Sequence, residues 1–225
     1  MDGLASQPLM TLLALAALSL LPFAFMVATS FVKISVVFSI LRNALGTGQV
    51  PSGMVITALA ATLTLYVMAP VGQEMLAVSG PALHAIDQDK PLAGKSLDSL
   101  FDAIDKGKEP LRAFLIKHAG KRELALFADL AKASRDAAHR SEVGIHDFLV
   151  VLPAFLITEL TEAFQIGFLV FVPFLIVDMV VANVLLALGM HMLSPTTVSL
   201  PFKLLLFVLV DGWFLLAKGL VLGYV

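Results

Sequence analysis

The sequence predicts an all-α membrane protein, with about four apolar helical segments and a small polar helical domain inserted between the second and the third. Hydrophobic residues make up 59% of the 225 residues and charged residues 14%, whereas soluble domains are typically about 45–50% apolar and about 25% charged. The charge is also concentrated, because segment 74–147 holds 23 of the 32 acidic and basic residues. We therefore divide the chain into an apolar region 1–73, the polar domain 74–147 and a second apolar region 148–225.

The first apolar region contains two runs of spanning length. Segment 9–32 has no charged residue, and at about 1.5 Å per residue it can cross a hydrocarbon core of ~30 Å. Pro22 lies inside it and predicts a kink. Segment 54–72 is the second uncharged run. Because no Lys or Arg precedes the first run, we expect it to be retained and not cleaved as a secretory signal.

The loop between these two runs predicts the orientation of the chain. Segment 33–52 contains Lys33 and Arg42 and no acidic residue. Short loops rich in Lys and Arg remain in the cytoplasm. This places the N-terminus and the polar domain on the opposite side of the membrane.

The polar domain has the spacing of three short amphipathic helices and nothing that indicates a strand. Apolar residues recur every three or four positions over 97–104, and Gly107 follows as a stop signal. The same spacing returns over 110–118 and 124–131.

The second apolar region begins with a run, 148–158, that is too short to cross a membrane alone. Segment 163–188 is long enough, although Pro173 and Asp178 interrupt it. Gly189 and the prolines after it then predict a loop at 189–195. Segment 203–224 is the last apolar run.

Three carboxylates lie in apolar sequence between 152 and 181, where there is no Lys or Arg. Glu159 and Glu162 are three residues apart and share a helix face, and Asp178 follows Pro173. A charge at the middle of a bilayer costs roughly 2.5–3.5 kcal/mol, so these groups should face protein or water. The partners we expect are Lys33, Arg42, Lys203 or a neighbouring subunit.

Three alternatives give these polar residues chemical roles. The acids could translocate protons or cations, or Asp178 and Asp211 could form an intramembrane aspartyl protease, although no Gly-rich segment opens a path for substrate. Met190, His191 and Met192 offer thioether and imidazole ligands that suit Cu(I), although there is no Cys and no second Met/His cluster.

The sequence contains no set of residues that predicts an enzyme. There is no nucleophile motif, phosphate loop, dinucleotide fingerprint or zinc-protease motif, so we expect no cofactor. The net charge of −2 supplies no basic field for nucleic acid.

Four segments resemble one family: "TSFVKISVVFSILRNALGTGQVP", "LYVMAPVG", "LPAFLITELTEAFQIGFLVFVPFLIVD" and "LSPTTVSLPFKLLLFVLVDGW". They are similar to the export-apparatus proteins of type III secretion, which comprise the SctR group of injectisomes and the flagellar FliP proteins. FliP proteins usually begin with a cleavable signal, which we do not expect here. That difference and the wording "LSPTTVS" favour the injectisome branch, which serves virulence.

The resemblance implies a non-enzymatic, multi-pass protein of the bacterial inner membrane, built of bent helical hairpins. It implies several copies that assemble with SctS- and SctT-like membrane subunits into a closed cone, largely above the bilayer plane, that passes unfolded effector proteins. The embedded acids, with Asp211, would then lie against neighbouring subunits. The alternatives are a flagellar FliP-type export subunit and, from another class, a proton-coupled membrane transporter.

The resemblance also assigns a role to the loop. The narrowest point of the family's channel is a methionine-rich loop that acts as a gasket, and the matching positions are Met190, His191 and Met192. The central His departs from the family pattern of successive methionines. Because an imidazole can ionise, the seal could depend on pH, or the side chain could point into solvent.

Overall fold

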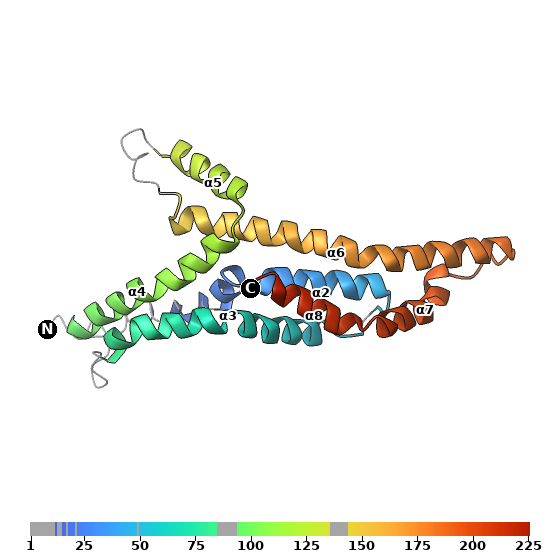
Figure 1. Cartoon of the computed structure of the whole chain (residues 1–225), viewed down its shortest axis with the longest axis horizontal. Coiled ribbons are helices and arrows are strands. Elements are labelled where there is room, and N and C mark those ends of the chain that lie inside the picture. The colour runs from blue at the N-terminus through green and yellow to red at the C-terminus, as the bar shows by residue number, and fades with distance from the viewer. Residues whose placement is uncertain are drawn as a thin grey trace. The chain divides into compact units, whose positions relative to one another are not determined.

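A computed structural model describes residues 12, 15–16, 18–20, 22–48, 50–84, 94–135 and 144–225, with the backbone alone at 83–84 and 94–98. These residues form helices and no strand, which confirms the all-α prediction (Figure 1). The helices are α2 (Phe31–Leu45), α3 (Gly53–His84), α4 (Gly94–His118), α5 (Lys121–Ala133), α6 (Phe148–Ala187), α7 (Pro195–Leu209) and α8 (Gly212–Leu222).

Two of these helices are long and apolar enough to cross a membrane. They are Gly53–Ala82 within α3, with 30 residues, and α6, with 40 residues. Two further pairs pass the same test only if each pair is counted as one broken span. The first pair joins Leu18–Val27 to α2, and the second joins α7 to α8 with a bend of 59°. By length and composition, the described residues therefore contain between two and four candidate spans, in line with the four apolar segments of the sequence.

Prolines interrupt the helices less than the sequence predicted. The predicted break near Gly107 is wrong, because α4 continues through Pro110 as one helix. Likewise, α6 is continuous through Pro173 and joins the two predicted runs, 148–158 and 163–188, into one helix. A proline inside a helix removes one hydrogen bond and favours a kink without ending the helix. Gly107 lies inside α4 beside Ser79, where an added Cβ would make an ordinary van der Waals contact of 3.6 Å with Cβ of Ser79.

The chain contacts divide into two compact units. The first unit comprises Met1–Thr29 and Met68–Thr158, and the second comprises Ser30–Val67 and Glu159–Val225. The polar segment 74–147 thus belongs entirely to the first unit.

In the first unit, aromatic contacts and one hydrogen bond join the polar helices to the start of α6. The ring of Phe114 on α4 lies 5.9 Å from that of Phe155 and 4.7 Å from that of His118, measured between centroids. The backbone N–H of Gly120, between α4 and α5, donates to Oγ1 of Thr158 over 2.8 Å. Because the hydrogen bond joins residues 38 positions apart, it fixes the turn between α4 and α5 against α6.

The outer face of α4 has exposed ion pairs one helical turn apart, such as Asp102 with Lys106. A hydrogen bond and the positive charge of Lys108 lower the pKa of the exposed Asp105 carboxyl below its ordinary value. Pairs this exposed contribute little to stability. They indicate that this face of the polar segment meets water.

The core of the second unit surrounds α2. Ile34, Val37, Phe38 and Leu41 follow the helical spacing i, i+3, i+4, i+7, and each is completely buried. Helix α2 also contributes Ala44 and Leu45 to this core, and the other helices of the unit contribute Ile56, Ala60, Ala163, Phe174, Phe207 and Leu220. Helix α2 is therefore the central element of this unit.

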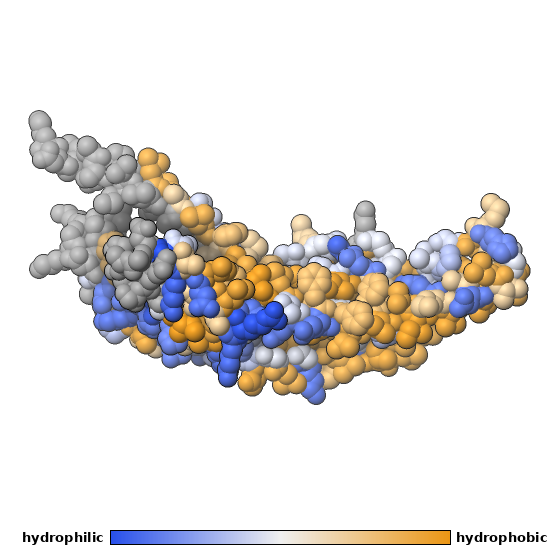
Figure 2. Space-filling view, turned by 90° about the horizontal axis from the view of Figure 1, so that it is seen from above, coloured by the Kyte–Doolittle hydropathy of each residue, from blue (hydrophilic) through white to orange (hydrophobic). Residues whose placement is uncertain are grey.

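Outside this core, large apolar side chains cover much of the surface. Leu65, Phe168, Val208 and Phe214 are each more than half exposed, and Figure 2 shows apolar residues over most of the helical part of the visible face. Apolar surface of this extent requires lipid or the apolar faces of other chains.

The turn between α7 and α8 depends on two residues with special backbone demands. Asp211 has φ 52° and ψ 50°, a left-handed conformation that Asp adopts more readily than most residues. Gly212 follows it, and a Cβ at Gly212 would collide with the ring of Phe207. That ring is fixed in place, because the indole of Trp213 packs edge-on against it with centroids 5.2 Å apart.

We expect Gly212→Ala to destabilise the second unit by about 1–3 kcal/mol, because the added methyl group must displace a packed ring. Thermal unfolding of the purified protein in detergent, followed by circular dichroism, measures the change. Gly219→Ala on the same helix is the matched control, since a Cβ there has no neighbour within 4 Å. Equal melting temperatures for the two variants would contradict this account of the turn.

Candidate functional site

Two clusters of buried charge lie within the second unit. The first, the Lys33 cluster, consists of Lys33, Glu159, Glu162 and Tyr224. Nζ of Lys33 on α2 lies 3.1 Å from Oε1 of Glu159 and 2.6 Å from Oε2 of Glu162, both on α6. The side chains of Lys33 and Glu159 are 3% and 1% exposed, whereas that of Glu162 is 47% exposed. The shared face predicted for the two glutamates thus meets one lysine.

Tyr224 completes the Lys33 cluster from the C-terminal end of the chain. Its hydroxyl donates a hydrogen bond to Oε2 of Glu159. Its ring receives the ammonium of Lys33 at 4.2 Å from the centroid, which is a cation–π distance. The cluster therefore joins α2, α6 and the residues that follow α8.

The second cluster, the Lys203 cluster, consists of Lys203, Asp178, Ser199 and the carbonyl of Ala44. Nζ of Lys203 on α7 lies 2.6 Å from Oδ2 of Asp178 on α6 and donates to the Ala44 carbonyl over 3.0 Å. Oγ of Ser199, one turn before Lys203, donates to the other oxygen of Asp178. The ammonium also lies at the C-terminus of α2, where the helix dipole favours positive charge.

The embedded acids thus find their partners within one chain. Of the partners that the sequence offered, Lys33 and Lys203 take up Glu159, Glu162 and Asp178. A neighbouring subunit is not needed to supply those positive charges.

The structure does not bring the other two predicted polar residues into either cluster. Within the described residues Arg42 forms no ion pair, and its Nε is buried without a hydrogen-bond partner. Asp211 is exposed at the turn between α7 and α8, and its backbone rather than its carboxylate is what the turn uses.

Sequence reasoning missed Tyr224, Ser199 and the Ala44 carbonyl. Ser199 had a usable signal, since it lies four residues before Lys203 and shares its helix face. The other two had none, because each becomes a partner only when distant helices pack together.

Met190, His191 and Met192 lie in the loop between α6 and α7, residues 188–194, which we call the methionine loop. Gly189 ends α6 with φ 73°, the N–H of Met190 bonds to the Leu185 carbonyl, and the N–H of Gly189 bonds to the Leu186 carbonyl. This is the Schellman pattern, in which a left-handed glycine follows the helix. The side chain of Met192 is 99% exposed and that of Met190 is 47% exposed.

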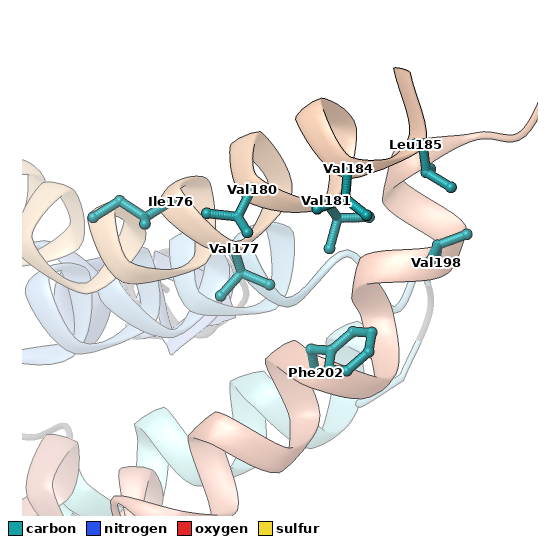
Figure 3. A pocket seen from close by; sticks show the side chains of 8 residues that line it. All are labelled: Ile176, Val177, Val180, Val181, Val184, Leu185, Val198 and Phe202. Atoms are coloured by element: carbon teal, nitrogen blue, oxygen red, sulfur yellow. The ribbon is translucent and has the colours of Figure 1, made fainter. Parts of the chain in front are cut away.

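An apolar groove of about 450 Å³ lies between α6 and α7 near the methionine loop (Figure 3). Val181 and Val184 on α6 and Val198 and Phe202 on α7 are among the eight residues that line it, all of them apolar. Because its lining side chains offer no hydrogen-bonding group, the groove favours apolar groups.

Two features of the structure concern the metal-binding and carboxylate chemistry considered for these residues. Among the described residues no group of three or more His, Cys, Asp or Glu side chains is placed to hold a metal ion. The carboxylate of Asp178 is held by Lys203 and Ser199, an arrangement that stabilises a charge and positions helices.

We expect Lys203→Met to destabilise the protein by about 2–4 kcal/mol, because it leaves Asp178 partly buried without its cation. The double variant Lys203→Met/Asp178→Leu should recover most of that loss, since apolar groups of similar size can replace a buried pair. Thermal unfolding of the wild type, both single variants and the double variant measures the coupling. Additive losses would show that the pair has no structural role.

We expect Tyr224→Phe to cost about 1–2 kcal/mol, because Glu159 loses a buried hydrogen-bond donor. For a protein of this size that corresponds to a fall in melting temperature of about 2–8 °C. Tyr66→Phe is the matched control, because Tyr66 is 69% exposed and should tolerate the same change. A smaller effect at Tyr224 than at Tyr66 would be inconsistent with the Lys33 cluster.

Comparison with known proteins identifies the family. The model of the family described as "FliP family" matches residues 14–220. The chain is 45% identical to "Yop proteins translocation protein R" of Yersinia pestis, over 95% of this chain and 94% of that protein. It is 43% identical to "Hypersensitivity response secretion protein HrcR" of Ralstonia nicotianae, over 92% and 93% of the two chains. It is also 43% identical to "Flagellar biosynthetic protein FliP" of Pectobacterium carotovorum, over 98% of this chain and 84% of that one.

Flagellar and injectisome proteins both match, and the similarity to the translocation and hypersensitivity proteins supports the injectisome branch. The chain therefore belongs to the FliP family of type III export-apparatus membrane proteins.

Proposed function

We propose that this chain is the core pore-forming subunit of a type III protein export gate and that it passes unfolded substrate proteins without catalysing a reaction. Members of this family are structural components of the export apparatus and not enzymes. Several copies of the chain would assemble with SctS- and SctT-like membrane subunits in the bacterial inner membrane. The polar segment 74–147 would then lie outside the cytoplasm.

The observation that supports a pore role is the position of the methionine loop. It lies at the end of two antiparallel helices, and in the single chain its Met192 side chain makes almost no contact with the rest of the protein. Methionine is unbranched and flexible, so a ring of such side chains can fill a narrow channel and still yield to substrates of different shape.

The Lys203 cluster supports the same role by holding the two helices that present the loop. Asp178 lies ten residues before Leu188, which corresponds to about 15 Å along α6. The pairing of Asp178 with Lys203 fixes α6 against α7 on the approach to the loop. The loop backbone would then be supported while its side chains remain free to move.

His191 is exposed between the two methionines. In the gasket it would either contribute to the seal or point toward solvent. Replacing it separately from the methionines distinguishes these roles.

We expect Met190→Ala/Met192→Ala to increase ion leakage through the assembled complex, because shorter side chains leave the narrowest point open. Conductance of the purified complex in planar bilayers measures the leak. Met179→Ala is the matched control, since Met179 is 57% exposed on α6 and lies outside the loop. Unchanged conductance in a fully assembled complex would refute the gasket role.

A further inference from the structure

The charged side chains of the second unit are paired unevenly, although their numbers are equal. The unit contains four cationic and four acidic side chains: Lys33, Arg42, Lys203, Lys218, Glu159, Glu162, Asp178 and Asp211. The Lys203 cluster is balanced, with one ammonium and one carboxylate. The Lys33 cluster is not, because one ammonium faces two carboxylates.

The excess negative charge lies at the surface. Glu159 is buried and has both Lys33 and Tyr224 as partners. Glu162 has Lys33 alone among the described residues, and its side chain is 47% exposed. A further cation from outside the chain can therefore reach Glu162 without displacing any internal contact.

A matching positive charge lies on α8. Lys218 is exposed, and its nearest partner among the described residues is the ring of Phe214, 5.8 Å from its ammonium to the centroid. No ion pair to a described carboxylate involves it. In apolar surroundings an unpaired ammonium is costly, so Lys218 also requires an external partner.

Glu162 and Lys218 lie at nearly the same level along the helices of this unit. In this unit α6 and α8 run in opposite directions (Figure 1), and Tyr224 and Glu159 meet at the Lys33 cluster. From that contact, Glu162 lies about 5 Å forward along α6, and Lys218 lies about 9 Å back along the chain through α8. Because the two helices are antiparallel, both displacements point in the same direction. Arg42, about 14 Å beyond Lys33 on α2, is further from the level of Glu162.

We infer that Lys218 of one copy binds Glu162 of the next copy. A two-fold dimer would form this contact twice and stop at two copies, whereas a head-to-tail contact uses it once per interface and can close a ring of identical subunits, which is the arrangement that the proposed function requires. It completes the charge of the Lys33 cluster and supplies the missing partner of Lys218 in one step. This inference rests on the proposed function, because it requires several copies around one channel.

Charge reversal at Lys218 tests the contact without altering the Lys33 cluster. Lys218→Glu would face Glu162 of the next copy, and because like charges in an interface are strongly unfavourable we expect the yield of oligomer to fall by about tenfold or more. Glu162→Gln/Lys218→Glu should recover part of that loss, since it removes the repulsion and leaves the pair of Lys33 with Glu159 in place. Lys218→Arg is the conservative control. Native mass spectrometry in mild detergent measures the oligomer, and thermal unfolding checks each variant for correct folding.

Cross-linking provides a second measurement that does not depend on charge. The chain contains no Cys, so Glu162→Cys/Lys218→Cys introduces the only thiols. A short bis-maleimide should join this variant into a ladder that extends beyond dimers, whereas each single-cysteine variant should give no ladder. Glu162→Cys/Leu205→Cys controls for exposure, because Leu205 on α7 is 57% exposed.

The outcomes separate this inference from the proposed function. If the wild-type chain forms no oligomer, the proposed function fails. If it forms an oligomer that Lys218→Glu leaves intact and the double-cysteine variant gives no ladder, the contact is wrong and the proposed function stands. An ammonium that binds lipid headgroups instead would give this second result.

Discussion

The fold of the second unit depends on the neutralisation of charge inside an apolar helical assembly. Between lipid-like surfaces, helices gain little from the hydrophobic effect, and their association relies on close packing and polar contacts. The two lysine clusters supply such contacts between α2, α6 and α7 and also engage the C-terminal Tyr224. A buried ion pair is not always more stable than an apolar pair of the same size, but breaking one partner is costly. Because both clusters must form at once, with Lys33 at Glu159 and Lys203 at Asp178, they favour one register of the helices.

The general nature of the fold follows from the sequence, whereas its internal pairing does not. Composition and charge distribution were sufficient to predict helices and apolar segments of spanning length, and the position of Gly189 was sufficient to place the end of α6. The sequence also included Lys33 and Lys203 among the candidate partners. It did not assign Glu159 to Lys33, because the two are 126 positions apart and meet only after α2 and α6 pack. The uninterrupted course of α4 and α6 was missed for a related reason, since packing tolerates prolines that local preference treats as breaks.

The pairing of the embedded acids with lysines of the same chain affects how copies of the chain can assemble. Had the acids required a neighbour, a single copy would have been unstable in an apolar environment. With the acids held by lysines of the same chain, each copy can fold first and then associate through its exposed apolar faces and the few charges that remain. Polar contacts at such an interface add specificity more than affinity, because they exclude misaligned partners. A small number of unpaired charges is therefore enough to select one arrangement among many that bury similar apolar area.

The methionine loop combines a fixed backbone with adaptable side chains. The glycine turn fixes how the chain leaves α6, and Pro195 at the first turn of α7 fixes how it enters the next helix. Between these two points Met192 has no packing within its own chain, so its conformation is determined by whatever lies opposite. If the backbone were mobile, the seal would have to re-form by chance after each substrate. With the backbone held by the turn and by the Lys203 cluster below it, only side-chain rotations are needed, and these are fast and reversible.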